Sequence, residues 1–185
     1  MRRKPVRLLA LSGSLRSKSS NAELLRAAAA LAPDDIEITL YGGIVALPHF
    51  NPDLEDALPP VVVDFRARVA AAAGLLISCP EYAHGVPGAF KNALDWLVGG
   101  PEFVYKPVAL LNASPRSSYA QESLAETIRT MSGRIIEEAS VALPLLGQRL
   151  DMNGIIARAD FSIAIRGAVA AFVEAIEAVQ VDSAD

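Results

Sequence analysis

Short, nearly continuous apolar runs alternate with longer segments of helical spacing along this chain, and this alternation restricts the folds open to it. The apolar runs are Val6–Leu11, Ile36–Leu40, Gly74–Cys79 and Val108–Asn112. Runs of this kind are typical of parallel strands that are buried on both faces. The helical segments are Ala22–Leu31, Val61–Ala73, Val86–Val98 and Tyr119–Met131, followed by a fifth strand at Ile135–Leu143 and a closing helix at Phe161–Val179. The sequence therefore predicts an α/β fold with a five-stranded parallel sheet and helices on both faces.

Length and composition indicate one globular domain over residues 1–185. Hydrophobic residues make up 52% of the chain and charged residues 21%, which is the balance of a folded protein. We find no linker or repeat. The formal net charge of -4 disfavours nucleic acid and anionic membranes as partners.

The single cysteine, Cys79, excludes an internal disulfide and is consistent with a reducing cytoplasm. Met1–Pro5 is basic, but the apolar run Val6–Leu11 is too short for a signal peptide and lacks a cleavage site, and no run is long enough to span a bilayer. With two histidines and one cysteine, the chain has few side chains of the kinds that bind zinc. We therefore expect a cytoplasmic protein with no metal and no membrane partner.

The loop Gly13–Asn21 lies between the first strand and the first helix and reads Gly-Ser-Leu-Arg-Ser-Lys-Ser-Ser-Asn. A helix N-terminus offers unpaired backbone N–H groups and a positive dipole end, and this loop adds hydroxyls and a guanidinium. The loop is neither a Walker A motif nor a G-x-G-x-x-G dinucleotide turn. It therefore favours a terminal phosphate as ligand, although Ser20 or Asn21 could instead serve only as a helix cap.

Two further polar loops, Pro80–Pro87 and Ala113–Tyr119, follow predicted strands. In open α/β sheets, ligands bind at the carboxyl ends of the strands, so the three loops should meet at one site. The long loop Gly42–Pro60 is also expected to be functional or to form an interface.

Three motifs together resemble the NADPH-dependent FMN reductase family of the flavodoxin-like fold, which includes quinone, chromate and azo-dye reductases. They are Gly13–Asn21, Leu47–Glu55, and the segment Pro80–Trp96 with its Pro-Glu-Tyr, Val-Pro-Gly and Lys-Asn-Ala-Leu-Asp-Trp elements. The resemblance covers nearly the whole chain. It implies bound FMN, a nicotinamide donor (NADPH, or NADH), a small-molecule electron acceptor, and a homodimer or homotetramer.

The resemblance also implies which residues bind the cofactor. For the FMN phosphate they are Ser14, Arg16, Ser19, Ser20 and Asn21; for the isoalloxazine ring they are Pro80, Glu81, Tyr82, Ala83, His84 and Gly85, mostly through backbone groups; Ser114 of the third loop completes the set. The chain differs from the family at Ala83, where many members carry Asn. Its third loop lacks the usual glycines and contains Arg116, which should narrow the approach to the flavin.

The implied reaction is hydride transfer from the nicotinamide to the flavin, followed by reduction of an acceptor, and it requires no catalytic residue of the protein. We expect Cys79 to be a buried apolar residue, Glu81 to order its loop rather than act as a base, and Phe90 and Trp96 to lie in the core or at a subunit interface. Two alternatives remain at this point: a flavodoxin-like electron carrier and a non-enzymatic flavin-binding regulatory protein. The sequence does not distinguish quinone, azo dye, chromate and free flavin as acceptors.

Overall fold

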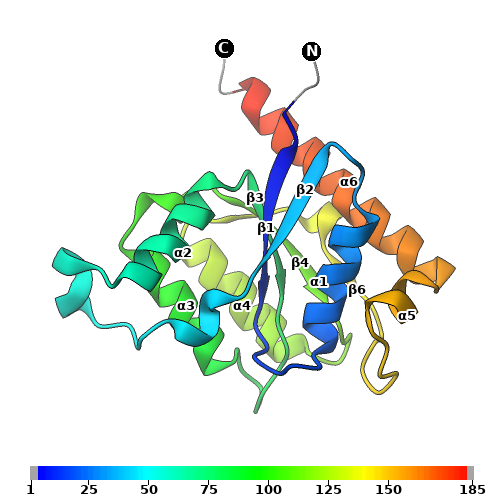
Figure 1. The fold of residues 1–185 in the computed structure, drawn as a ribbon, viewed down its shortest axis with the longest axis horizontal. Coiled ribbons are helices and arrows are strands. Elements are labelled where there is room, and N and C mark those ends of the chain that lie inside the picture. Colours follow the sequence, from blue (N-terminus) through cyan, green and yellow to red (C-terminus); the bar gives the residue numbers. More distant parts are fainter. Residues whose placement is uncertain (1–3, 183–185) are drawn as a thin grey trace.

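The protein folds around a twisted parallel sheet, seen at the centre of Figure 1 in a computed structural model that describes residues 4–182. Its main strands are β1 (Val6–Ser12), β2 (Ile36–Tyr41), β3 (Gly74–Ser78) and β4 (Pro107–Asn112). The strand order is β2-β1-β3-β4-β5, and every neighbouring pair is parallel. This order is that of the flavodoxin-like fold, so the predicted fold class is confirmed.

The predicted fifth strand, Ile135–Leu143, is wrong in detail. Two strands of two residues, β5 (Arg134–Ile135) and β6 (Val141–Ala142), both pair with β4, and a 3₁₀ turn, η4 (Glu137–Ala139), separates them. The side chain of Ser140 accepts a hydrogen bond from the Leu110 N–H and donates one to the Ile136 carbonyl. The Leu110 N–H thus donates to a side-chain hydroxyl, where a continuous neighbouring strand would offer a backbone carbonyl.

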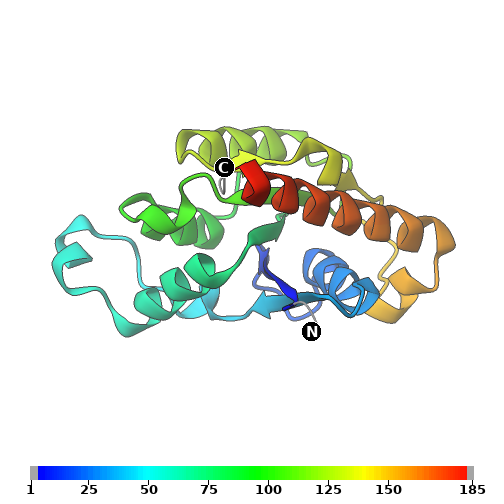
Figure 2. The same cartoon turned by 90° about the horizontal axis from the view of Figure 1, so that it is seen from above.

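The helices cover both faces of the sheet, with α2, α3 and α4 on one side and α1, α5 and α6 on the other (Figure 1). Their bounds are α1 Ser20–Leu31, α2 Pro60–Ala71, α3 Gly88–Val98, α4 Ser118–Thr130, α5 Met152–Ile156 and α6 Ala159–Asp182. Helix α3 begins two residues after its predicted start, because Pro87 holds an extended backbone at the N-cap. The short helix α5 is not predicted by the sequence pattern. Seen from above, α6 begins beside α5 and runs along the molecule away from it (Figure 2).

Strand residues alternate between two cores. In β1, Leu8 and Ala10 pack with α1 and α6, whereas Leu9 and Leu11 pack with α2, α3 and α4. Parallel strands buried on both faces need apolar residues at every position, which explains the continuous apolar runs of the sequence. Phe90 and Trp96 lie in the second core, as expected.

The long loop after β2 is tied to α3. It contains the 3₁₀ turns η1 (Gly43–Ala46) and η2 (Pro52–Ala57). Asn92 of α3 accepts from the Phe50 N–H and donates to the Pro48 carbonyl, which also accepts from the indole of Trp96. These bonds join two of the motifs that carry the family resemblance.

No helix within residues 4–182 has both the length and the apolarity to cross a membrane. The basic start Met1–Arg3, which belongs to the segment tested for a signal peptide, lies outside the described residues, as do Ser183–Asp185 of the predicted domain.

Candidate functional site

The three polar loops meet in one pocket of about 190 Å³ at the carboxyl ends of β1, β3 and β4. Its lining residues come from all three loops and from the segment after β6: Ser14, Arg16, Lys18, Ser19, Ser20, Asn21, Pro80, Glu81, Tyr82, Asn112, Ala113, Ser114, Ser117 and Leu146. A pocket below the roughly 300–1,000 Å³ of most ligand sites fits the phosphate-bearing end of a ligand better than a whole flavin.

The first loop is held by short-range hydrogen bonds of its own serines. The Ser12 hydroxyl accepts from the Ser14 N–H and donates to the Ser14 carbonyl, and the Ser14 hydroxyl accepts from the Arg16 N–H. The Gly13 N–H donates to the Ser78 carbonyl at 2.9 Å, which extends the pairing of β1 with β3 by one residue. These bonds fix the loop while leaving the Arg16 side chain exposed to solvent.

Helix α1 points its N-terminus into the pocket. Ser19 is the N-cap, and its hydroxyl accepts from the Ala22 N–H at 3.4 Å. Asn21 is oriented by Ser78 of β3, whose hydroxyl donates to Asn21 Oδ1 at 2.9 Å. With its oxygen engaged there, Asn21 has its amide N–H groups left to offer to a ligand.

The second loop contains a tight turn between Tyr82 and Gly85, which form an antiparallel bridge with two backbone hydrogen bonds of 3.0 and 3.1 Å. Its two central residues, Ala83 and His84, both have positive φ, 51° and 60°. Positive φ at both positions is the mark of a type I′ turn, for which Asn and Gly are the favoured residues. The turn therefore carries backbone strain at the site, of a kind that clusters at functional positions.

Glu81 joins the second loop to the third. Its Oε2 accepts from the Ala120 N–H at 3.0 Å, which caps the N-terminus of α4, and its Oε1 lies 3.4 Å from His84 Nδ1. The His84 ring packs edge-on against Tyr119 with a centroid distance of 4.4 Å. This arrangement is consistent with the expectation that Glu81 orders its loop.

Cys79 is buried beneath the loops, with 1% of its surface exposed. Burial raises the pKa of its thiol from 9.0 to about 12. A thiol that stays protonated is a poor nucleophile and a poor redox group, so the structural role expected for Cys79 fits its surroundings.

Nine of the twelve predicted site residues line the pocket: Ser14, Arg16, Ser19, Ser20, Asn21, Pro80, Glu81, Tyr82 and Ser114. Ala83, His84 and Gly85 do not line it; they follow the lining residue Tyr82 in the turn that the Tyr82–Gly85 bridge closes. Their contact with a flavin stays a prediction, as do the individual roles of the other nine.

Several lining residues are absent from the sequence-based set. Lys18 and Ser117 belong to loops that the sequence did single out, so their positions could have been included. Asn112 ends β4, and its Oδ1 accepts from the Ser114 N–H at 2.8 Å. Leu146 follows β6 and is 67% exposed, and no local pattern indicates that the chain returns to the pocket there.

The donor set of the pocket fits the phosphate end of FMN. A helix N-terminus, several hydroxyls and two cations converge there, and this is the chemistry that binds a phosphate monoester. Together with the flavodoxin-like strand order, the pocket defines the class of small flavin-binding α/β proteins.

Comparison with known proteins identifies the family within this class. The profile of the NADPH-dependent FMN reductase family matches residues 6–145, and the chain belongs to this family. An NAD(P)H-dependent FMN reductase from Pseudomonas aeruginosa is 34% identical over 155 residues, which cover 80% of this chain and 83% of the relative. A 2-hydroxy-1,4-benzoquinone reductase from a Burkholderia species is 32% identical over 161 residues, covering 84% and 87%.

A solved structure shows the same fold. The flavoenzyme NAD(P)H:acceptor oxidoreductase FerB from Paracoccus denitrificans superposes with a TM-score of 0.82 at 28% identity and covers 92% of this chain and 97% of its own. The predictions of family, enzyme class, FMN and a nicotinamide donor are thereby confirmed: the chain is an NAD(P)H-dependent FMN oxidoreductase that reduces a small acceptor.

Proposed function

We propose that this enzyme reduces quinones, and that the pocket between its three loops binds the phosphate end of FMN. The convergence of the α1 N-terminus, the loop hydroxyls and Arg16 in one pocket carries the proposal. Ser14, Ser19, Ser20 and Asn21 would donate hydrogen bonds to the phosphate, and Arg16 would add a charge-assisted one.

The turn Tyr82–Gly85 would lie along the flavin ring and present backbone groups to its edge. Glu81 supports this role because its bond to α4 fixes the turn relative to the third loop. When bound, FMN supplies two-electron transfer between the nicotinamide and the acceptor. The residues of this chain bind it, orient it and restrict what approaches.

A quinone fits the mouth of the pocket better than a large acceptor does. Tyr82 lines the pocket, Tyr119 packs against His84 of the same turn, and both are half exposed. The third loop contains Pro115 and Arg116 in place of small residues. Exposed aromatic rings favour a planar partner through stacking. Two relatives named for quinone reduction, from a Burkholderia species and from Escherichia coli, support the same acceptor class.

Acceptor turnover and flavin affinity test the two halves of the proposal separately. We expect the FMN-reconstituted protein to oxidise NADPH with a benzoquinone at a higher kcat/KM than with an azo dye, chromate or free flavin. A higher value for any of these three would contradict the quinone assignment.

Arg16→Ala should weaken FMN binding about ten- to a hundredfold, the range for one charged hydrogen bond. Riboflavin lacks the phosphate, so its binding should hardly change. Fluorescence titration with both flavins measures this difference. Arg134→Ala is the control, because it removes the same charge from the start of β5, at the amino end of the sheet. Equal losses for FMN and riboflavin would mean that Arg16 does not contact the phosphate.

We further propose a cytoplasmic homodimer or homotetramer. Val45, Val98 and Tyr105 are exposed on or beside η1, α3 and η3 (Pro101–Phe103), and α3 contacts both of these 3₁₀ turns. Light scattering after size exclusion would give the mass, and a monomer at micromolar concentration would contradict the oligomer. Recovery of the protein outside the cytoplasmic fraction would contradict the location.

A further inference from the structure

Many arginines and lysines of this protein already have a partner. Six of them each form an ion pair with a carboxylate: Arg26, Arg66, Arg68, Lys91, Arg129 and Arg158. Lys106 and Arg166 donate to the carbonyl groups of Ala72 and Leu31. Among residues 4–182, the side chains without such a partner are those of Lys4, Arg7, Arg16, Lys18, Arg116, Arg134 and Arg149.

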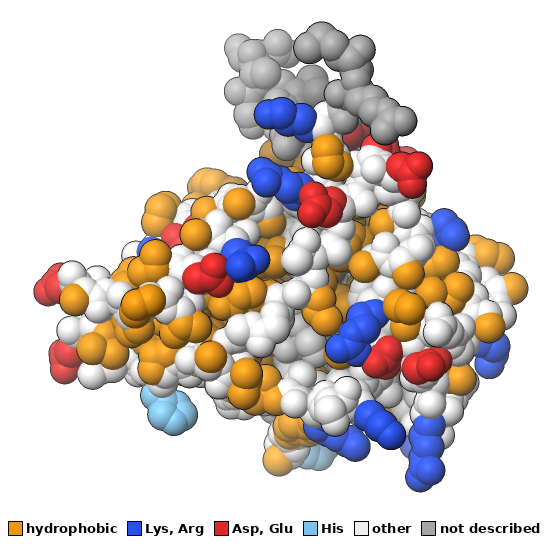
Figure 3. All heavy atoms as spheres, in the orientation of Figure 1, with side chains coloured by type: hydrophobic (Ala, Val, Ile, Leu, Met, Phe, Trp, Pro, Cys, Tyr) orange, Lys and Arg blue, Asp and Glu red, His pale blue; other side chains and the backbone are white. Residues whose placement is uncertain are grey.

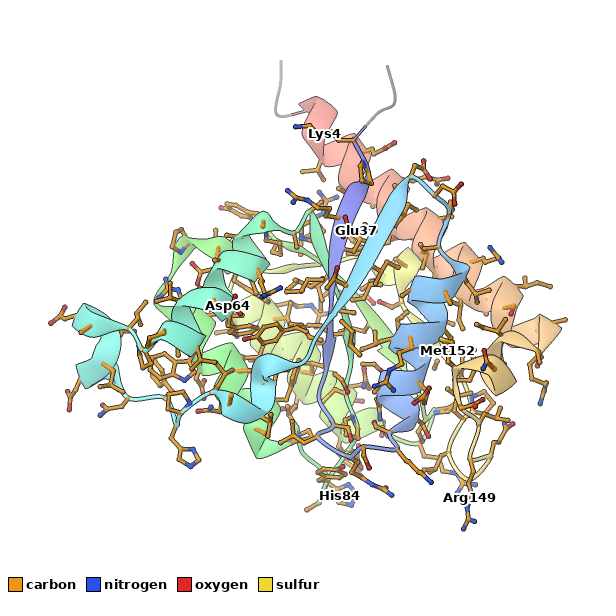
Figure 4. The ribbon with its side chains drawn as sticks, in the orientation of Figure 1. Lys4, Glu37, Asp64, His84, Arg149 and Met152 are labelled. Atoms are coloured by element: carbon orange, nitrogen blue, oxygen red, sulfur yellow. The ribbon has the colours of Figure 1, made fainter. Side chains whose placement is uncertain are left out.

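Two of these unpaired cations line the pocket, and two more lie within three residues of a lining residue, whereas Lys4, Arg7 and Arg134 belong to the amino end of the sheet. Arg16 and Lys18 line the pocket, and Arg116 lies between Ser114 and Ser117, which also line it. Arg149 follows three residues after Leu146, another lining residue. Figure 3 shows Lys and Arg side chains along this end of the molecule, and Figure 4 shows that Arg149 projects from the same end as His84, opposite Lys4.

Arg149 belongs to residues 143–151, which we call the strap. At its start, the N–H groups of Leu143 and Leu145 donate to the carbonyls of Asn112 and Ala113, beside the third loop. Just past its end, the Met152 N–H donates to Glu23 in the first turn of α1. The strap therefore connects the third loop with the helix of the first loop.

The strap turns sharply between these anchors. Gly147 and Arg149 have positive φ, 85° and 51°, and Gln148 closes the turn through bonds to Leu145 and Pro144. A non-glycine residue at positive φ is uncommon, and the turn holds Arg149 in this conformation. The family profile ends at residue 145, so Arg149 lies beyond the residues that the family match covers.

We propose that Lys18, Arg116 and Arg149 form an outer anion subsite that binds the 2′-phosphate of NADPH and so distinguishes it from NADH. This inference rests on the proposed function, because it assigns Arg16 and the inner pocket to the FMN phosphate. A 2′-phosphate carries a charge of about -1.5 to -2 and is the one group by which the two donors differ. The three cations have no carboxylate partners, although the chain has a net charge of -4. Their positive charges therefore remain available to bind a phosphate.

Arg149→Asn is the sharpest variant, because Asn removes the charge but tolerates a left-handed backbone. We expect kcat/KM for NADPH to fall about three- to tenfold, as for an exposed charged contact, while the value for NADH changes less than about twofold. Arg149→Lys should recover part of the loss. Arg134→Asn is the control, because it removes an equal charge at the amino end of the sheet. It should leave the ratio of kcat/KM for NADPH to kcat/KM for NADH unchanged.

Binding without turnover provides a second measurement. In calorimetric titration of the FMN-loaded protein, adenosine 2′,5′-bisphosphate should bind more tightly than 5′-AMP, and Arg149→Asn should remove most of the difference. A wild-type enzyme that does not prefer NADPH, or equal losses for both donors in Arg149→Asn, would overturn the subsite. An enzyme that discriminates the donors but reduces no quinone would contradict the proposed function alone, so the two failures are distinguishable.

Discussion

Gly13 lies against Cys79 so closely that a Cβ added at Gly13 would come within 2.6 Å of the Cys79 sulfur and 3.1 Å of its Cα. The two residues follow the neighbouring strands β1 and β3. The first loop can therefore leave the sheet at this point only because position 13 has no side chain. The fixed start of the loop in turn sets where its serines and Arg16 lie.

Gly13→Ala should displace the first loop and weaken FMN binding by more than about tenfold. Overpacking of this kind costs about 1–3 kcal/mol of stability, so the Tm should also fall. The Cys79→Ala background removes the sulfur but leaves the backbone at position 79 in place, so it should restore part of both losses. Flavin titration of the single and double variants measures the FMN affinity, and thermal unfolding measures the Tm. Unchanged FMN affinity in Gly13→Ala would show that the close approach has no role in binding.

Cys79→Ala should retain most of the NADPH oxidation activity, because a buried protonated thiol takes no part in the reaction.

The raised pKa of Cys79 also predicts that the stability of the protein depends on pH. Between about pH 9 and 12, the thiol ionises in the unfolded chain but stays protonated in the folded one. The unfolded state then binds fewer protons, so this group lowers the free energy of unfolding as the pH rises.

The difference in unfolding free energy between the wild type and Cys79→Ala should change across this pH window by up to about 1.4 kcal/mol per pH unit. Urea unfolding at about pH 8, 9 and 10 measures it. A difference that does not vary with pH would contradict the burial of an unionised thiol. Loss of turnover beyond about a hundredfold with FMN still bound would instead assign the thiol a catalytic role.

Glu81→Ala should destabilise the N-terminus of α4, since the Ala120 N–H loses its acceptor. The expected loss is about 0.5–2 kcal/mol, the usual contribution of a helix cap. Glu81→Gln retains an acceptor oxygen and should stay close to the wild type in both Tm and kcat. If Glu81→Gln kept its Tm but lost kcat by more than about a hundredfold, Glu81 would be a general base after all.

The sequence predicts the sheet and the three site loops because local chemistry determines them. The runs Val6–Leu11 and Gly74–Cys79 are apolar at nearly every position, and a strand buried on both faces requires this. The strap could not be predicted in the same way. Its return to the pocket depends on hydrogen bonds between residues far apart in the chain, such as the one from the Met152 N–H to Glu23. The sequence around Leu146 and Arg149 contains no motif that indicates a binding site.

The interrupted fifth strand has a similar cause. Ile135–Leu143 contains enough apolar residues to indicate one strand, but Ser140 takes over a backbone hydrogen bond of Leu110 through its hydroxyl. The pairing of Glu81 with the N-terminus of α4 is likewise a long-range contact. Sequence alone could suggest that Glu81 orders a loop, but it could not identify α4 as the partner.

Asn21→Asp should weaken FMN binding while it preserves the fold. An aspartate has the same shape, and its oxygen can still accept the hydrogen bond from the Ser78 hydroxyl, which is fully buried and needs an acceptor. The change replaces the amide N–H groups with a negative charge at the N-terminus of α1, where an anion is expected to bind. FMN affinity should fall more than about tenfold, and riboflavin affinity much less.

Asn21→Ala is the matched comparison, because it removes the acceptor and leaves Ser78 unpaired. An unsatisfied buried hydroxyl costs about 1–3 kcal/mol, so this variant should unfold at a clearly lower temperature than Asn21→Asp. Thermal unfolding and flavin titration of both variants separate the two roles of Asn21. An Asn21→Asp protein that binds FMN as tightly as the wild type would place the phosphate away from the N-terminus of α1 and would contradict the assignment of the pocket.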